Sequence, residues 1–384
     1  MIEQGGRVHS GIHVGMEDGI RGIVATTPLK EGEELLFCPW KLVIGSASLQ
    51  DQMNKDPGKM CHVVLDMAEE IRLGSNSLWF PYLDHIELPR LPAAWDAVAL
   101  NELQGLGPTQ DATCHLQWFQ QECSRTSSRE PSLDPATLRS LVAFISRASE
   151  VGMIPICDLL NHHNGQRNTK LVLHEDGVSL KVVGGDIAAG KQLYLSYGVK
   201  SAATMYRDYG FVEAWPIIYN FQDATSGDNF AFVVLAEDNN DYANNNAIAG
   251  AVAINPTSQF LKGLWHANMP LVEYQVTAQQ HMESLALDEL LRFAQAAQRR
   301  LQEFPTTWQQ DAAILEDRTR QRNEILLAAG DANDDTAISN LQDMASAIQY
   351  RQAFKQALEL AATTCESMAV AQRATTRSTT KQEL

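Results

Sequence analysis

Hydrophobic and polar residues follow two different periods along this chain. Residues 20–44 contain short apolar or β-branched runs separated by Pro and Gly, which predicts two or three strands. A second block of this kind begins near Ile154. Within it, TKLVLHEDGVSLKVV has two alternating runs around Asp176 and Gly177 and predicts a hairpin, and KQLYLSYG predicts a further strand. SAATMYRDYGF then predicts a short helix that ends at Gly210.

The other parts of the chain have helical spacing. From about Ser46 to Leu141 the patterns are longer, with an interruption at PYLDHIELPRLP, and they predict a mostly helical insertion between the two β blocks. From about residue 270 the chain again has apolar residues at helical spacing. We interpret these stripes as faces along which helices pack together. The tail RATTRSTTKQEL has little to bury and predicts disorder.

Composition restricts the partners of this 384-residue chain, which is long enough for two or three domains. The formal net charge is −17, and no block rich in Lys or Arg interrupts it. A phosphate backbone needs a clustered positive surface, so the charge disfavours nucleic acid as the main partner. Acidity instead favours basic protein partners, including lysine-rich segments. No apolar run reaches membrane-spanning length, so we expect a protein substrate and no membrane.

Six cysteines are scattered along the chain without a CxxC pair. This predicts reduced thiols, hence a cytoplasmic or nuclear protein, and it gives neither a zinc cage nor another structural metal site. The first residues lack the features of a signal or transit peptide, so a plastid location would require a leader that precedes this chain. No exposed heptad seam is evident, and we expect a monomer.

Two short motifs suggest chemistry that their surroundings do not support. GDIAAGK resembles a phosphate-binding loop, but Gln192 follows where Ser or Thr would hold magnesium, and a strand pattern follows where a helix is needed. We interpret it as a Gly-closed turn. Asp158, His162 and His163 suggest a metal site, but no third spaced ligand follows. No GxSxG or GxGxxG motif supports a serine hydrolase or a dinucleotide enzyme.

Four segments occur in a fixed order: GIRGIVAT, SRASEVGMIPICDLLNHHNGQRN, LYLSYG and YGFVE. Together with WFPYL, NELQG and TTWQQDAAIL, this set resembles the SET-domain protein methyltransferases of the RuBisCO large-subunit methyltransferase class, from about Gly11 to about residue 365. The resemblance implies an α+β fold, in which a SET domain of small β-sheets with a pseudo-knot is split by a helical insertion and followed by an all-α C-terminal substrate-binding domain. The expected parts are residues 1–45 and 141–222 for the two SET halves, 46–140 for the insertion, 223–372 for the helical domain and 373–384 for the disordered tail.

The resemblance also implies S-adenosyl-L-methionine as the cofactor and assigns residues to its pocket. A guanidinium fork suits the carboxylate of the cofactor, and peptide groups beside an Asn-His pair can match adenine. The expected cofactor-binding residues are Ile20, Arg21, Arg147, Asn161, His162, Tyr209 and Phe211. The chain departs from the family at the first of these, because Ile20 stands where a glycine is usual and Arg21 replaces an apolar residue.

Tyr197 is the expected catalytic residue, because its hydroxyl at a strand end can orient an amine and accept weak contacts from a polarised methyl group. Ser149 and Asp158 are the expected substrate-binding residues. Lysine on a non-histone protein is the favoured acceptor. The string IPICDLLNHHNG also resembles the actin-histidine methyltransferase, and in a histidine enzyme Asp158 could orient an imidazole. A protein-binding module with the same fold and weak catalysis is a further alternative.

Overall fold

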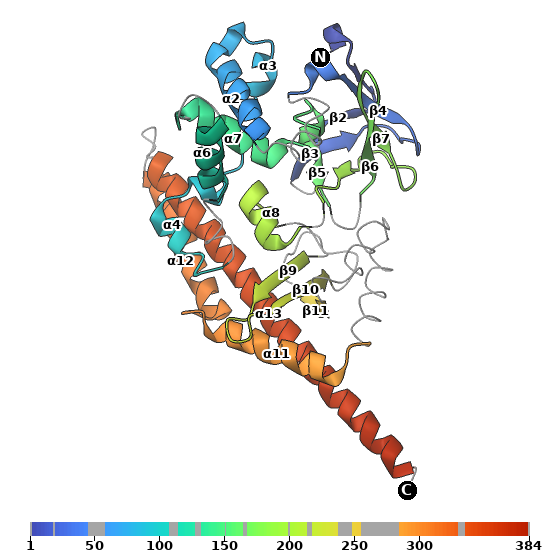
Figure 1. The fold of residues 1–384 in the computed structure, drawn as a ribbon, viewed down its shortest axis with the longest axis vertical. Helices are drawn as coiled ribbons and strands as arrows, with labels where there is room; N and C mark the ends of the chain where they lie inside the picture. The colour runs from blue at the N-terminus through green and yellow to red at the C-terminus, as the bar shows by residue number, and fades with distance from the viewer. Residues whose placement is uncertain are drawn as a thin grey trace. The chain divides into compact units, whose positions relative to one another are not determined.

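The computed structural model describes residues 2–17, 20–44, 58–106, 114–126, 132–149, 151–163, 167–198, 200–212, 217–236, 248–254, 284–328 and 335–382 (Figure 1). The chain divides into two compact units. The first comprises Met1–Ala93, Thr113–Gly198 and Asp208–Gly210, and the second comprises Ala94–Ala112, Val199–Arg207 and Phe211–Leu384. The candidate functional residues, apart from Phe211, belong to the first unit.

Small sheets form the β part of the first unit. Its strands are β1 (Arg7–Val8), β2 (Ile12–Glu17), β3 (Ile20–Ala25), β4 (Glu34–Pro39), β5 (Asn161–His162), β6 (Thr169–Leu173), β7 (Gly177–Val182) and β8 (Tyr194–Leu195). One antiparallel sheet has the order β1-β4-β7-β6, β2 pairs with β3, and β5 pairs in parallel with β8. The strands predicted in residues 20–44, the hairpin around Gly177 and the strand in KQLYLSYG are thereby confirmed.

Helices form the rest of this unit. They are η1 (Ile2–Gln4), η2 (Trp40–Leu42), α2 (Gly58–Leu73), η3 (Gly74–Asn76), α3 (Phe80–Leu83), η4 (Pro92–Ala94, whose last residue falls in the second unit), α6 (Cys114–Thr126), α7 (Pro135–Arg147) and η5 (Cys157–Leu159). The insertion is mostly helical, as its spacing predicted. Buried strand residues such as Leu36, Val178 and Leu180 form one apolar core, and Val64, Phe119 and Phe144 belong to another between α2, α6 and α7.

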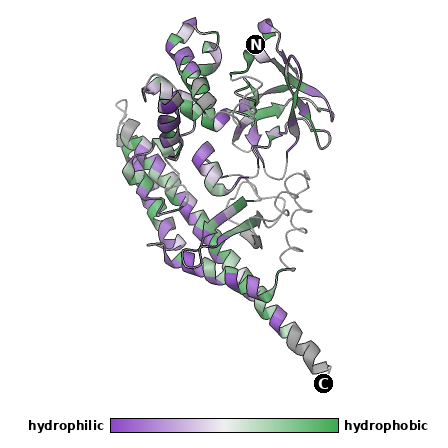
Figure 2. Ribbon diagram, in the orientation of Figure 1, coloured by the Kyte–Doolittle hydropathy of each residue, from purple (hydrophilic) through white to green (hydrophobic). Residues whose placement is uncertain are grey.

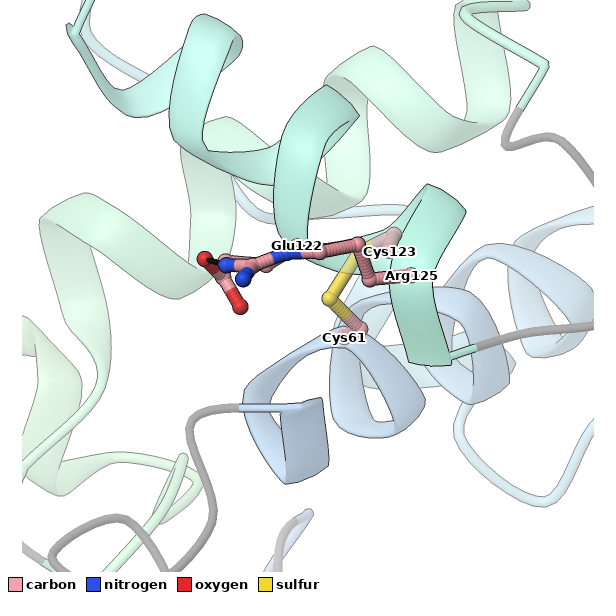
Figure 3. Close-up of a disulfide and its surroundings, with 4 residues drawn as sticks. All are labelled: Cys61, Glu122, Cys123 and Arg125. Atoms are coloured by element: carbon pink, nitrogen blue, oxygen red, sulfur yellow. Dashed lines mark hydrogen bonds and ion pairs between the residues drawn. A yellow bond between two sulfur atoms is a disulfide. The ribbon is translucent and has the colours of Figure 1, made fainter.

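A disulfide joins Cys61 on α2 to Cys123 on α6, next to the Glu122–Arg125 ion pair (Figure 3). The prediction of reduced thiols is therefore wrong for these two residues. They are 62 positions apart, and only the packing of α2 against α6 brings them together, so no local spacing could reveal the pair. Cys38, Cys157 and Cys365 are free and buried.

The second unit combines a sheet with long helices. Its strands β9 (Ile217–Gln222), β10 (Asn229–Ala236) and β11 (Ile248–Ile254) form an antiparallel sheet in the order β11-β10-β9. Its helices are α4 (Ala97–Asn101), α11 (Leu287–Gln302), α12 (Trp308–Ala328) and α13 (Asp335–Gln382), and α8 (Ala202–Tyr209) belongs to it through Arg207. Hydrophobic and hydrophilic residues alternate along α11 and α13 (Figure 2), and their buried faces pack with Phe232 and other sheet residues into one core.

Two observations in the second unit differ from the sequence-based expectations. The helical domain is preceded by the β9–β11 sheet in the same unit, where strand pairing uses the apolar run FAFVVLA. Helix α13 also continues through Gln382, whereas we expected a disordered tail from residue 373. A continuous helix satisfies its own backbone hydrogen bonds without burying an apolar face.

Candidate active site

Parallel pairing of β5 with β8 assembles the centre of the site. Asn161 lies opposite Tyr194 and His162 opposite Leu195, which brings the segment after β8 to the Asn-His pair. The backbone N–H of Tyr197 donates to His162 Nδ1 at 3.0 Å, and the two rings stack with centroids 5.1 Å apart. Three residues singled out in the sequence, from segments more than thirty positions apart, therefore lie together.

The Tyr197 side chain is held on two sides. Its hydroxyl donates to the Leu160 carbonyl oxygen at 2.5 Å, and its ring lies 4.8 Å from the ring of Tyr209. Burial, followed by the neighbouring Tyr209, raises the pKa of the Tyr197 hydroxyl well above its ordinary value. The group therefore stays protonated at neutral pH. Because it donates its only hydrogen to Leu160, its oxygen lone pairs remain available as acceptors.

Arg147 is the last residue of α7, a helix that begins with Asp134 capping the Thr137 N–H and Pro135 in the first turn. One terminal nitrogen of its guanidinium donates to the carbonyl oxygen of Asp158 at 3.1 Å and to its carboxylate at 3.3 Å, and the other donates to the Glu87 carbonyl. The Arg147 Nε is buried without a hydrogen-bond partner. The side chain is thus fixed in place while part of its donor capacity is left over.

Asp158 and Tyr82 are buried polar neighbours of Arg147. The Asp158 side chain is fully buried, and its carboxyl interacts with Arg147 and with the Tyr82 hydroxyl. Burial raises the pKa of the Asp158 carboxyl, and the charge of Arg147 opposes this rise. Burial and the neighbouring Asp158 raise the pKa of the Tyr82 hydroxyl. Buried polar atoms without partners are rare in folded proteins. The unpartnered Arg147 Nε therefore offers a charged donor to a polar group of a ligand.

The edge of β3 contacts the Asn-His segment closely. Asn161 Nδ2 donates to the Arg21 carbonyl oxygen at 2.7 Å and to Gln192 Oε1 at 2.5 Å. A Cβ atom on Gly22 would lie 2.5 Å from Gln192 Oε1 and 2.8 Å from Asn161 Nδ2. Strand β3 therefore requires a glycine at position 22. Ile20 lies in β3 with its side chain outside the described residues, and the Arg21 guanidinium pairs with Glu87 at 2.9 Å.

The two remaining sequence-based candidates are placed differently. Ser149 uses its hydroxyl inside a turn, where it donates to the Gly152 carbonyl oxygen at 2.8 Å. Phe211 belongs to the second unit, with 36% of its surface exposed, and its part in the cofactor pocket stays a prediction. Tyr209, by contrast, contacts Tyr197 directly.

Sequence reasoning did not assign a role to Gln192 or Tyr82. Gln192 is buried, and besides accepting from Asn161 its Nε2 is left without a hydrogen-bond partner. Its only signal in the sequence was its position after GDIAAGK, which spoke against a phosphate loop. Tyr82 lies in WFPYL, which contributed to the family resemblance without pointing to a particular side chain.

His163, next to His162 in the sequence, is a buried histidine beside the site. Burial, and to a smaller extent His162, lowers the pKa of His163 to about 4. The centroid of its ring lies 5.2 Å from that of Tyr194, in an edge-on arrangement.

The GDIAAGK segment forms a turn region in which Ile187 forms a β-bridge with Leu29. Within the part of the chain that the structure describes, no three His, Cys, Asp or Glu side chains gather as a metal site would need, and no helix is long and apolar enough to cross a membrane.

Comparison with known proteins places this geometry in a recognised fold. No family model matches the chain. Over 234 residues, 51% of its length, the chain is 25% identical to the actin-histidine N-methyltransferase of Gallus gallus, and the match spans only 38% of that protein.

Solved structures match almost the whole chain. The SET domain of LSMT bound to lysine and AdoHcy has a TM-score of 0.54 and 17% identity, with 96% of this chain and 90% of that chain covered. Rubisco LSMT bound to sinefungin and monomethyllysine has the same TM-score and identity, with 97% and 90% covered. The fold is therefore that of the SET-domain protein LSMT, and the α+β class predicted from the sequence is confirmed.

Proposed function

We propose that this chain transfers a methyl group from S-adenosyl-L-methionine to a lysine side chain of a non-histone protein. The observation that carries the proposal is the convergence of Asn161, His162 and Tyr197 through the β5–β8 pairing, beside the partly satisfied Arg147–Asp158 pair. The named neighbours add support: LSMT has been crystallised with lysine and with AdoMet.

The described residues fit such a cofactor. Arg147 Nε is a charged donor without a hydrogen-bond partner, and it suits a carboxylate. Backbone groups of the Asn161–His162 strand lie at the Gly22 edge, where the absence of a side chain permits close approach. Arg147 would hold the amino-acid part of the cofactor, and the Asn161–His162 strand would hold its base.

When bound, S-adenosyl-L-methionine supplies a sulfonium-activated methyl group that an uncharged nucleophile attacks in line. The task of Tyr197 is to position that nucleophile. Its oxygen accepts a hydrogen bond from the amine or a weak C–H contact from the methyl group. Its own hydrogen is donated to the Leu160 carbonyl oxygen. Backbone carbonyl groups beside the methyl group would act as fixed dipoles that favour its partial positive charge.

The acceptor amine must lose a proton before it attacks. A free lysine has a pKa near ~10.4, and removal from water beside a positive charge lowers that pKa. The half-buried rings of Tyr197 and Tyr209, whose hydroxyl pKa values are raised by burial, supply a partly desolvated surrounding of this kind. The net charge of −17 favours approach of a lysine-bearing basic segment.

Histidine is the second candidate acceptor, and the identity with the actin-histidine enzyme favours it. Two contacts favour lysine. The Ser149 hydroxyl is already committed to Gly152, and the Asp158 carboxylate is fully buried against Arg147, so neither side chain is presented as a partner for an imidazole. On this geometry Asp158 acts as the counter-ion of Arg147 rather than as a direct substrate contact.

The proposal is tested by incubating the full chain with methyl-labelled S-adenosyl-L-methionine and a cell extract. We expect a labelled protein band that is absent with Tyr197→Phe, and mass spectrometry that places the methyl group on lysine. A methyl group on histidine would support the second candidate. Cofactor binding without any labelled product would instead favour a binding module that has the fold without the activity.

A further inference from the structure

A hydrogen bond between the helical insertion and the end of α8 lies just outside the candidate active site. His115 Nε2 on α6 donates to the Asp208 carboxylate at 2.7 Å, and the two side chains are 24% and 10% exposed. The residues are 93 positions apart in the sequence, so the pair joins two distant segments of the first unit. None of the steps proposed above requires either side chain.

Asp208 immediately precedes Tyr209, the last residue of α8, whose ring lies 4.8 Å from that of Tyr197 and tilted by 33°. Gly210 then ends the helix with a φ of +77°, and a Cβ atom there would lie 3.0 Å from Pro89 Cβ. The end of α8 is therefore tied to His115 by a hydrogen bond, and there is little room for a side chain at Gly210 beside Pro89. Any displacement of Asp208 also displaces the ring against which Tyr197 packs.

The helix that carries His115 is itself firmly held. The disulfide from Cys123 attaches α6 to α2, and Phe119 on α6 is completely buried (Figure 3). Helix α2 is joined in turn to α7 by the Ser140 hydroxyl, which donates to the Val64 carbonyl oxygen at 2.6 Å. His115 thus projects from a rigid support, which is what an anchor for an active-site wall needs.

We propose that His115 is a positioning residue that acts through Asp208 to fix Tyr209, and thereby the ring and hydroxyl of Tyr197. This inference rests on the proposed methyl transfer, but the placement of the rings is testable without it. A residue of this kind affects turnover more than cofactor affinity, because the alignment it maintains matters chiefly in the transition state.

His115→Ala removes the anchor, and His115→Gln keeps a side-chain donor that can still reach the carboxylate. His9→Ala is a matched control: it breaks another His–carboxylate pair of the first unit, in which His9 Nε2 meets Glu33 at 3.0 Å in the segment between β1 and β2. Labelling rates against the band in the extract give apparent kcat and KM values for S-adenosyl-L-methionine.

We expect His115→Ala to lower the apparent kcat about tenfold while KM changes less than about twofold, and His115→Gln to recover most of the rate. His9→Ala should retain the wild-type rate. The inference is overturned if His115→Ala loses no more activity than His9→Ala, or if it raises KM and leaves kcat unchanged.

A second readout needs no activity. In protein labelled with 3-fluorotyrosine, the ¹⁹F resonances of Tyr197 and Tyr209 are assigned from their Phe variants. Both resonances should shift in His115→Ala and keep their positions in His9→Ala. If they do not move in His115→Ala, the inference fails even where methyl transfer is observed. If they move but the wild type labels no protein, the positioning holds and the proposed function fails.

Discussion

The Tyr197 hydroxyl donates to the carbonyl oxygen of Leu160, one residue before the Asn161–His162 strand. The bond links the end of β8 to the start of β5 through a side chain, in addition to the backbone pairing of the two strands. It fixes the direction of the Tyr197 oxygen. A tyrosine that only filled a core would not need this oxygen directed beside the strand where the cofactor is proposed to bind.

Replacing Tyr197 by Phe tests this role. The ring and its packing on His162 and Tyr209 remain, while the hydroxyl is lost. We expect methyl transfer to fall by at least about 100-fold, because the nucleophile is no longer oriented, and cofactor affinity to change by less than about threefold. Filter-binding and labelling assays measure the two quantities. Equal fold losses in the methyl-transfer rate and in the cofactor affinity would point to a role in binding only.

Gly22→Ala tests the close approach of β3 to Asn161. The added methyl group would collide with Gln192 and Asn161, so we expect the Kd for S-adenosyl-L-methionine to rise about tenfold, or about 1.4 kcal/mol. Gly15 is paired with Gly22 across the β2–β3 hairpin. A Cβ atom on Gly15 would meet His13 Nε2 at 2.8 Å instead of Asn161 and Gln192, so Gly15→Ala is the control that should bind normally. Calorimetric titration compares them, and equal affinities for both variants would remove Gly22 from the pocket.

His163 makes stability depend on pH. Its pKa is lowered from 6.5 to about 4 in the folded chain, so below pH 6.5 the unfolded chain binds a proton more readily. The stabilisation is complete above pH 6.5 and is lost as the pH falls through about 4. Denaturant unfolding should show His163→Gln losing less stability than wild type over that interval, by up to about 3 kcal/mol. If the free energies of unfolding of the two proteins fell in parallel with pH, the burial of a neutral imidazole would be contradicted.

The disulfide should stabilise the first unit. A cross-link that closes a loop of this length contributes about 2–4 kcal/mol, mainly by restricting the unfolded chain. A reducing agent should therefore lower the melting temperature of the wild type and leave that of a Cys61→Ser, Cys123→Ser double variant unchanged. Peptide mapping without reductant should recover Cys61 and Cys123 in one linked peptide. Recovery of separate thiol peptides would show that the bond does not form.

A buried ion cluster should stabilise the second unit. Asp311 is fully buried, with its carboxylate 2.7 Å from Lys355 Nζ and 3.0 Å from Arg351 Nε. Asp311→Ala leaves Lys355 without its counter-ion and Arg351 with Glu102 alone, and it should lower the free energy of unfolding by about 3–5 kcal/mol. Asp317 pairs with Arg320 at the surface, and Asp317→Ala should cost less than about 0.5 kcal/mol. Urea unfolding distinguishes them, and similar losses would argue against the buried cluster.

Local signals in the sequence predicted the local parts of the fold. Alternation around Gly177 gave the β6–β7 hairpin, and the glycine at position 210 gave the end of α8, where a positive φ is needed. The ordered motifs gave Asn161, His162 and Tyr197 as neighbours. Their direct contact follows from a parallel pairing of two-residue strands, which is too short to produce a periodic pattern.

Long-range contacts could not be predicted in the same way. The Arg147–Asp158 pair, the Asn161–Gln192 hydrogen bond and the disulfide depend on which elements pack together, and periodicity does not encode this. The pairing of His115 with Asp208 is of the same kind. In each case the residue types were visible in the sequence, but their partners were determined by tertiary packing.

Photolabelling locates the cofactor on the chain without an acceptor protein. The full chain is irradiated with methyl-labelled S-adenosyl-L-methionine, and the labelled peptides are mapped by mass spectrometry. We expect label within residues 147–163 or 194–198, suppressed by excess unlabelled S-adenosylhomocysteine. Competable label confined to other segments, or no competable label, would contradict a cofactor site between the Asn161–His162 strand and Tyr197.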